Sequence, residues 1–172
     1  MRLRPLALMS GTAVALAVLT GPAADAADTT VTFTVTSGAL TISAPPGPVS
    51  LGSAAAGGSV SGPIGTVTVT DARGGVPTSD WTARVSSTAF TGPSDTVPAS
   101  AATYTPGAGT LIVGNGTLTP GPGGTLDVQR VAMTYTGGTG NSQASWNPTI
   151  SVSIPLGVGL GTYTGTVTHS VA

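Results

Sequence analysis

Few side chains of this sequence could do chemistry. Among its 172 residues there is one histidine, His169, and no cysteine. His169 falls on the apolar side of an alternating segment, and no Gly-x-Ser-x-Gly motif accompanies it, so a Ser-His-Asp triad is not indicated. Zinc sites need several Cys or His ligands, and the Asp residues are too dispersed for a calcium loop. We therefore expect no metal and no cofactor, and we expect His169 to be a half-buried residue of an edge strand.

Two aspartates flank one predicted loop and could act as a carboxylate pair. Asp71 and Asp80 would then hydrolyse a glycosidic bond. Glutamate is absent, however, and an Asp beside turn glycines usually accepts local backbone hydrogen bonds. Asp71 could also form an ion pair with Arg73 inside the turn. These features favour a non-catalytic protein.

Aromatic side chains remain as possible binding groups, because sugar rings and partner surfaces stack on them. Phe33, Trp81 and Tyr163 share the parity of apolar neighbours in their segments, which predicts core positions. Trp146 and Tyr104 lie in or beside polar loops. We expect these two to be the exposed contacts.

The beginning of the chain is typical of a secretory signal peptide. Arg2 and Arg4 precede an apolar run over residues 6–19, and Ala24-Asp25-Ala26 is a small-x-small cleavage site. The alternative, a retained membrane anchor, is disfavoured because the run is shorter than the roughly 20 residues that span a bilayer. We expect a signal helix over 1–26, cleavage after Ala26, and a mature protein that is secreted.

Composition excludes some partners. Only 6% of the residues are charged, and neither Lys nor Glu occurs. Nucleic-acid binding needs clustered basic residues, so we expect no nucleic-acid partner. After removal of the signal we expect no membrane attachment, and without cysteine no disulfide supports the fold. Its stability then comes from apolar burial and β-ladders.

Apolar residues alternate with threonine along most of the mature chain. The pattern predicts strands over residues 30–36, 40–42, 66–70, 81–86, 150–156 and 163–171, and a weaker hairpin that joins Tyr104 to residues 111–113. Leu126 and Val128 differ in parity from Val131, Met133 and Tyr135, so a β-bulge near residues 129–130 is expected. Gly/Pro-rich or polar loops are expected at 44–62, 91–100, 114–124 and 137–145.

These elements indicate an all-β fold. Short strands with turn-rich connectors predict one antiparallel β-sandwich over residues 27–172, immunoglobulin-like, with a jelly roll as the alternative. No repeat is apparent, which disfavours a solenoid.

Residues 66–90, TVTVTDARGGVPTSDWTARVSSTAF, resemble the first signature of the WxL-type surface domain of Gram-positive bacteria. Residues 163–169, YTGTVTH, are similar to the closing strand of that family, with His169 where the family has a tryptophan and Ala83 where it has a leucine. The resemblance implies an extracellular β-rich domain that associates noncovalently with the cell wall, through peptidoglycan, beside other surface proteins. The positions carried over are Asp71, Arg73, Gly74, Trp81, Tyr163 and His169.

Two hypotheses about function follow. The first is a secreted, non-catalytic module associating noncovalently with the cell wall, with Trp146 added to the carried-over positions as a binding residue. The second is a self-assembling extracellular structural or adhesive subunit, because nearly uncharged strand edges without lysine favour edge-to-edge association. The sequence leaves the oligomeric state open.

Overall fold

The computed structural model describes residues 27–74 and 78–172. The expected signal segment, residues 1–26, and Gly75 of the predicted turn lie outside the described residues. The chain divides into two units, Met1–Thr34 and Val35–Ala172, and all regular structure of the described residues belongs to the second. Among the described residues, no helix is long and apolar enough to cross a membrane.

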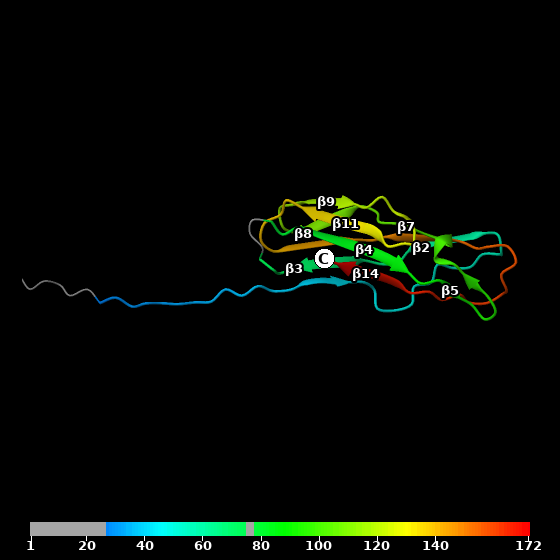
Figure 1. The fold of residues 1–172 in the computed structure, drawn as a ribbon, viewed down its shortest axis with the longest axis horizontal. Coiled ribbons are helices and arrows are strands. Elements are labelled where there is room, and N and C mark those ends of the chain that lie inside the picture. Colours follow the sequence, from blue (N-terminus) through cyan, green and yellow to red (C-terminus); the bar gives the residue numbers. More distant parts are fainter. Residues whose placement is uncertain (1–26, 75–77) are drawn as a thin grey trace, which may run out of the picture. The chain divides into compact units, whose positions relative to one another are not determined.

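The described residues are all-β, with one short 3-10 turn, η1 (Ala99–Ala101), as their helical element (Figure 1). The strands are β1 (Leu40–Ser43), β2 (Ser59–Pro63), β3 (Val67–Asp71), β4 (Trp81–Ser87), β5 (Phe90–Thr91), β6 (Thr96–Val97), β7 (Ala102–Thr105), β8 (Gly109–Val113), β9 (Thr117–Pro120), β10 (Gly124–Thr125), β11 (Arg130–Thr136), β12 (Ser142–Trp146), β13 (Thr149–Ser153) and β14 (Val167–Val171).

Three pairs of consecutive strands build one long, bent layer. In these pairs β2 leads into β3, β7 into β8, and β12 into β13. One half of the layer is an antiparallel sheet of the order β1-β3-β12-β8, and the other half is an antiparallel sheet of the order β10-β7-β13-β2. The amide of Ile64 donates to the carbonyl of Pro148 at 2.9 Å, so the ladder continues across the bend. Prolines mark these bends because a residue without an amide hydrogen cannot donate to a continuous ladder.

The second layer has the order β14-β4-β11-β9. Its central strand β4 buries Trp81, Ala83 and Val85 while Thr82 and Arg84 point outward, as the alternation predicts. The edge strand β14 lies against β1 of the first layer. β5 and β6 form a separate small ladder.

The core lies between the inward faces of the two layers. Val67 and Val69 of β3 face Ala132, Met133 and Tyr135 of β11 within one buried cluster. The other fully or nearly buried apolar residues of this cluster are Trp81, Ala83, Val85, Val97, Ala102, Tyr104, Leu126, Ala144, Trp146, Ile150 and Val152. Apolar burial of this kind supplies the main stabilising term in a protein without disulfides.

The predicted antiparallel β-sandwich is confirmed. Its central ladders are nested, since β3 pairs with β12 while the next strand, β4, pairs with β11, the strand before β12. Nested pairing of successive strands is the arrangement of a rolled-up hairpin, so the central strand order is closer to the jelly-roll alternative than to the immunoglobulin order.

One predicted strand is absent from the structure. Residues 30–36 form no strand, and Val31, Phe33 and Val35 are 81–86% exposed. The alternation is typical of a strand, but a strand also needs a neighbour for its backbone, and here none is recorded. The core position predicted for Phe33 is therefore wrong.

Other boundaries also differ. Strands β2, β6, β9 and β12 lie within segments predicted as loops, and β7 and β8 pair with β13 and β12 instead of with each other. The bulge of β11 falls between Val131 and Met133, slightly later than expected. It turns both Ala132 and Met133 inward, while Val128 is 52% exposed and shares no inward face with Leu126.

Candidate functional site

The turn after β3 holds a buried carboxylate. Asp71, whose side chain is fully buried, accepts hydrogen bonds from the Arg73 amide and Nε, both at 2.9 Å, and from Arg73 Nη2 at 2.8 Å. The hydrogen bonds from the Arg73 side chain lower the pKa of Asp71 below its ordinary value, although burial opposes this. The predicted local ion pair is therefore present, and it is more enclosed than a surface pair.

The same guanidinium ties the turn to the start of β4. Arg73 Nη2 also donates to the carbonyl of Asp80 at 3.0 Å, and the carboxylate of Asp80 accepts from the Gly137 amide at 2.8 Å. Gly74 adopts a φ of 65°, a left-handed conformation that favours glycine. Asp71 thus accepts local hydrogen bonds, as expected for a turn residue, whereas the Asp80 carboxylate accepts from Gly137, 57 positions along the chain.

Trp81 is an internal residue. Its ring is 2% exposed and stacks on Tyr135 with centroids 5.5 Å apart. Its indole N–H donates to the Ser142 hydroxyl at 3.3 Å, and Ser142 pairs directly with Asp71 across the ladder. Asp71, Arg73, Gly74 and Trp81 therefore lie at one end of the sandwich, where they close the β3–β4 connection.

A second polar cluster crosses the middle of the core. The Trp146 indole N–H donates to the Tyr104 hydroxyl at 3.0 Å, and that oxygen lies 3.2 Å from His169 Nε2. Trp146 is 2% exposed and Tyr104 is fully buried, so the expectation that these two are exposed contacts is wrong. Both sit on inward positions of strands, and β12 was missed in a segment of low apolar content.

His169 is half-buried on the edge strand β14, as predicted. Desolvation lowers its pKa to about 4 and raises the pKa of Tyr104 to about 12, so both are neutral near pH 7. The Tyr104 hydroxyl and His169 Nε2 share one hydrogen bond, and the imidazole tautomer decides which of the two donates. Nδ1 is buried and has no hydrogen-bond partner.

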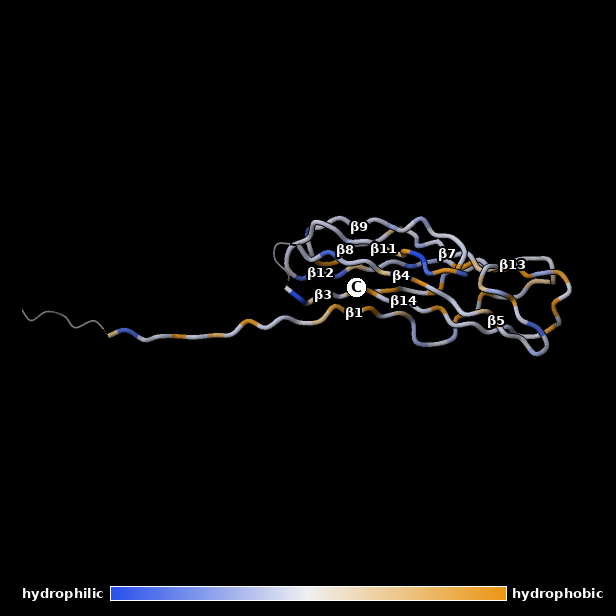
Figure 2. The backbone as a smooth tube through the Cα atoms, in the orientation of Figure 1, coloured by the Kyte–Doolittle hydropathy of each residue, from blue (hydrophilic) through white to orange (hydrophobic). Residues whose placement is uncertain are grey.

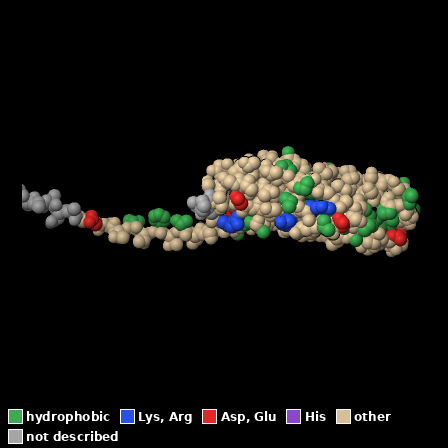
Figure 3. All heavy atoms as spheres, turned by 45° about the horizontal axis from the view of Figure 1, so that its top comes forward, with side chains coloured by type: hydrophobic (Ala, Val, Ile, Leu, Met, Phe, Trp, Pro, Cys, Tyr) green, Lys and Arg blue, Asp and Glu red, His purple; other side chains and the backbone are tan. Residues whose placement is uncertain are grey.

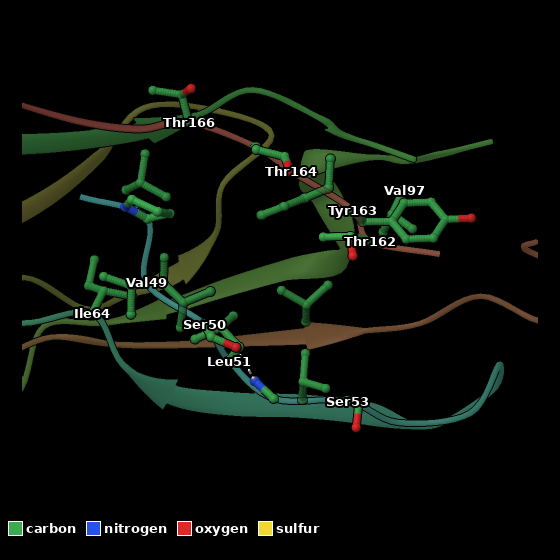
Figure 4. A pocket seen from close by; sticks show the side chains of 18 of the residues that line it. Val49, Ser50, Leu51, Ser53, Ile64, Val97, Thr162, Tyr163, Thr164 and Thr166 are labelled. Carbon is green, nitrogen blue, oxygen red and sulfur yellow. Dashed lines mark hydrogen bonds between the residues drawn. The ribbon is translucent and has the colours of Figure 1, made fainter. Parts of the chain in front are cut away.

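An open groove has His169 among its lining residues. It has a volume of about 970 Å³, and no charged residue lines it. Its apolar walls include Val60, Ile64, Ile150, Val152 and Val158. Residues 44–54, here called the strap, form one side, and residues 158–167 form the other. Figure 4 shows Val49, Ser50 and Leu51 of the strap on one side and Thr162, Tyr163 and Thr164 on the other.

Tyr163 is the one sequence-predicted site residue besides His169 that lines this groove. Its hydroxyl donates to the Gly159 carbonyl at 2.9 Å, which braces the segment that leads into β14. The structure therefore distributes the predicted residues over three places: the β3–β4 end, the central cluster of Trp146 and His169, and the groove.

The outward face of the first layer, here called the hydroxyl face, is rich in hydroxyl groups, with Val113 and Pro63 as its apolar interruptions. Directly paired residues share a face, and one cross-strand row is Ser43, Thr68, Ser145 and Thr110. A second row is Ser61, Ser151 and Thr103. The other members are Thr41, Ser59, Thr70, Thr105, Gln143, Thr149 and Ser153, and none of these rows contains a charged residue.

Figure 3 shows that, on the face it displays, a few charged side chains lie among mostly uncharged atoms. The alternation of threonine or serine with other residues in the sequence indicated strands with hydroxyl groups on one side. Only the strand pairing reveals that these hydroxyl groups form rows across one layer. Among residues 27–74 and 78–172 no cluster of His, Cys, Asp or Glu is suited to hold a metal ion.

No protein-family model, curated protein or solved structure matches this chain.

Proposed function

We propose that the chain is a secreted, non-catalytic module of the cell surface that associates noncovalently with the cell wall. The observation that carries the proposal is the hydroxyl face, which spreads without a charge over four neighbouring strand positions: β1, β2 with β3, β12 with β13, and β7 with β8. Hydroxyl groups both donate and accept hydrogen bonds, as do the hydroxyls of a glycan strand. A neutral polysaccharide such as the glycan of peptidoglycan therefore suits this face, whereas an ionic polymer does not.

The mode of binding differs from the one that the family resemblance implies. Trp81 and Trp146 are each 2% exposed, so neither ring offers a face for stacking on a sugar. Their role in this proposal is to hold the layers together, and the glycan contact passes to the threonine and serine rows.

Sedimentation with isolated cell walls tests the proposal. The exported protein is mixed with walls and centrifuged, and the fraction in the pellet is measured. A triple variant, Thr103→Val, Thr105→Val and Thr110→Val, removes three exposed hydroxyls and keeps the β-branched shape. We expect its affinity to fall about tenfold or more, because each lost hydrogen bond is worth about 1 kcal/mol.

A matched control places the same change on the other layer. Thr82, Thr119 and Thr134 form one outward row of the second layer, and their replacement by valine leaves the hydroxyl face intact. We expect this control to pellet like the parent. A parent protein that stays wholly in the supernatant refutes the proposal, and equal loss in both triple variants refutes the assignment to the hydroxyl face.

The second candidate is a self-assembling extracellular subunit. One observation favours it: Val31, Phe33 and Val35 form a row of large apolar side chains that are more than four-fifths exposed. Exposed apolar rows in water mark sites of association.

A further inference from the structure

Residues 30–36, here called the N-terminal segment, have the pattern of a strand without its sheet. Val31, Phe33 and Val35 alternate with four threonines, and none of these residues lies in a regular element. Figure 2 shows the recurring hydrophobic positions along this extended stretch. Such a segment gains both ladder hydrogen bonds and apolar burial when it joins the edge of a sheet above an apolar surface.

The groove offers such an edge. β2 pairs with β13 on one side, and no ladder is formed on its other side. The strap passes this side, but no backbone hydrogen bond joins residues 44–54 to β2. Pro45, Pro46 and Pro48 lack amide hydrogens, so the strap is a poor ladder partner. Every residue of the N-terminal segment has the amide that these prolines lack.

We infer that the N-terminal segment of one copy adds as a strand beside β2 of a second copy, with Val31, Phe33 and Val35 in the groove. This inference rests on the second proposed function, self-assembly, and names the parts that would carry it. Neither the groove lining nor residues 29–36 contain a charge, so no ion loses its water when they meet.

Side-chain sizes along the two strands are complementary. On β2 and just after it, Val60 and Ile64 line the groove, and Gly62 lies between them on the same parity of the strand. A strand opposite them presents Val31, Phe33 and Val35 at the same period of two. The large ring of Phe33 then faces Gly62, where the only atom near an added Cβ is a methyl carbon of Leu51 in the strap, at 3.6 Å. Movement of that leucine makes room for the ring.

The direction of the chain points to a second copy as the acceptor. β1 runs from Leu40, beside Asp71, to Ser43, beside Thr68, and continues into the strap toward the groove. Gly38, just before β1, is held beside Ala72, at the end of β3 that is remote from the groove residue Ile64. The Gly38 amide donates to the Ala72 carbonyl at 2.8 Å, and a chain reversal into its own groove would have to break this contact.

Addition of a strand from copy to copy is head-to-tail. Each copy then has one donor segment and one groove, and because these are different surfaces the contact does not close by twofold symmetry. The expected product is a chain of subunits that grows with concentration.

The first test measures molar mass by light scattering at rising concentration of the exported protein. Val31→Asp with Phe33→Asp places two charges in the groove, and we expect assembly to fall at least tenfold. The matched control, Thr32→Asp with Thr34→Asp, adds the same charges on the opposite parity and should assemble like the parent. Because these side chains are almost fully exposed in the subunit, neither change disturbs folding.

A strictly monomeric parent overturns both self-assembly and this inference. Assembly that survives Val31→Asp with Phe33→Asp leaves self-assembly standing and overturns the strand addition.

The second test uses the absence of cysteine from the parent. A Phe33→Cys variant is mixed with a differently tagged Val60→Cys variant under mild oxidation, and we expect a mixed disulfide-linked dimer. Ser61→Cys, one residue along β2 on the outward face, is the control and should link at least tenfold less. Equal linking of the two acceptors overturns the placement of Phe33 in the groove.

Discussion

Tyr104 and His169 come from opposite layers of the sandwich and meet inside it, with the hydroxyl oxygen 3.2 Å from the imidazole Nε2. The two residues are 65 positions apart in the sequence. Their contact joins the inner strand β7 to the edge strand β14, and the Trp146 indole extends it into β12. Three strands are therefore held by one chain of polar contacts inside the sandwich.

Acid should destabilise the fold through His169. Burial lowers the pKa of His169 to about 4, whereas an unfolded histidine has its ordinary pKa near 6.5. As pH falls, the unfolded chain binds the proton first, so the contribution is complete above about pH 6.5 and is lost between about pH 6.5 and 4. The total loss is roughly 3 kcal/mol of unfolding free energy. Urea denaturation at a series of pH values measures it.

The His169→Gln variant is the control for this titration. Glutamine keeps a polar side chain beside Tyr104 but carries no titrating group. We expect the stability of this variant to be nearly flat over the same pH interval, because Asp71, with its pKa lowered by Arg73, titrates at lower pH. A slope as steep as that of the parent would contradict the assignment to His169.

Removal of the Tyr104 hydroxyl should be costly at any pH. Tyr104→Phe leaves the Trp146 indole N–H without its acceptor in a buried position, and His169 Nε2 also loses its neighbour. Leaving a buried polar group unpaired costs about 1–3 kcal/mol. Denaturant unfolding of Tyr104→Phe should therefore show a loss in this range.

Tyr163→Phe serves as the comparison. This hydroxyl donates to the Gly159 carbonyl in a partly exposed connection, where water can replace it. We expect a smaller loss than for Tyr104→Phe. Equal losses of unfolding free energy in the two variants would mean that the hydrogen bonds of the Tyr104 hydroxyl contribute no more to stability than that of the Tyr163 hydroxyl.

Sequence patterns correctly predicted the structural features that depend on residues close together in the sequence. The alternation of valine with threonine in residues 66–70, and of Trp81, Ala83 and Val85 with polar residues in 81–86, predicted the strands β3 and β4 to within one residue and their inward faces correctly, because each inward face is buried by the opposite layer. The Asp71–Arg73 pair was likewise foreseeable, since it spans two residues.

Features that depend on distant partners were not predictable in this way. β12 reads Ser-Gln-Ala-Ser-Trp and has little apolar signal, yet it is a central strand, because β3 and β8 pair with it on both sides. Its inward residues Ser142 and Ala144 are small and buried. Missing this strand led directly to the error about Trp146.

The N-terminal segment is the opposite case. Its alternating pattern is typical of a strand. Periodicity indicates only that one side of the segment is apolar, and it does not say which strand would pair with the segment. The family resemblance of residues 66–90 stays a prediction, since it concerns function more than the strands that the structure contains.

The buried carboxylate of Asp71 should be important for stability. Asp71→Asn weakens three hydrogen bonds from Arg73 and leaves the guanidinium without its counter-charge. We expect a loss of about 1–3 kcal/mol in unfolding free energy, as for other buried polar groups deprived of a partner. Asp127→Asn is the control, because Asp127 is exposed and its contact with Arg130 is 3.8 Å long. No measurable change is expected there, and a similar loss in both would show that burial of Asp71 does not matter.

The packing of Tyr135 should not tolerate a side chain at Gly116. An added Cβ would lie 2.6 Å from two ring carbons of Tyr135 and 2.7 Å from the Thr136 carbonyl oxygen, so the ring would have to move. Overpacking of this kind costs about 1–3 kcal/mol. Because Tyr135 stacks on Trp81, Gly116→Ala should also change the near-ultraviolet circular dichroism of the tryptophan.

Gly47→Ala separates this steric effect from the general effect of replacing glycine. Nothing lies within 4 Å of a Cβ added at Gly47, which belongs to the strap. Its stability should stay within about 0.5 kcal/mol of the parent, as for other surface changes. If Gly116→Ala is as stable as Gly47→Ala, Tyr135 has room to shift, and the stack with Trp81 is then looser than its geometry implies. If only Gly116→Ala is destabilised, Tyr135, the residue that stacks on Trp81, is tightly packed.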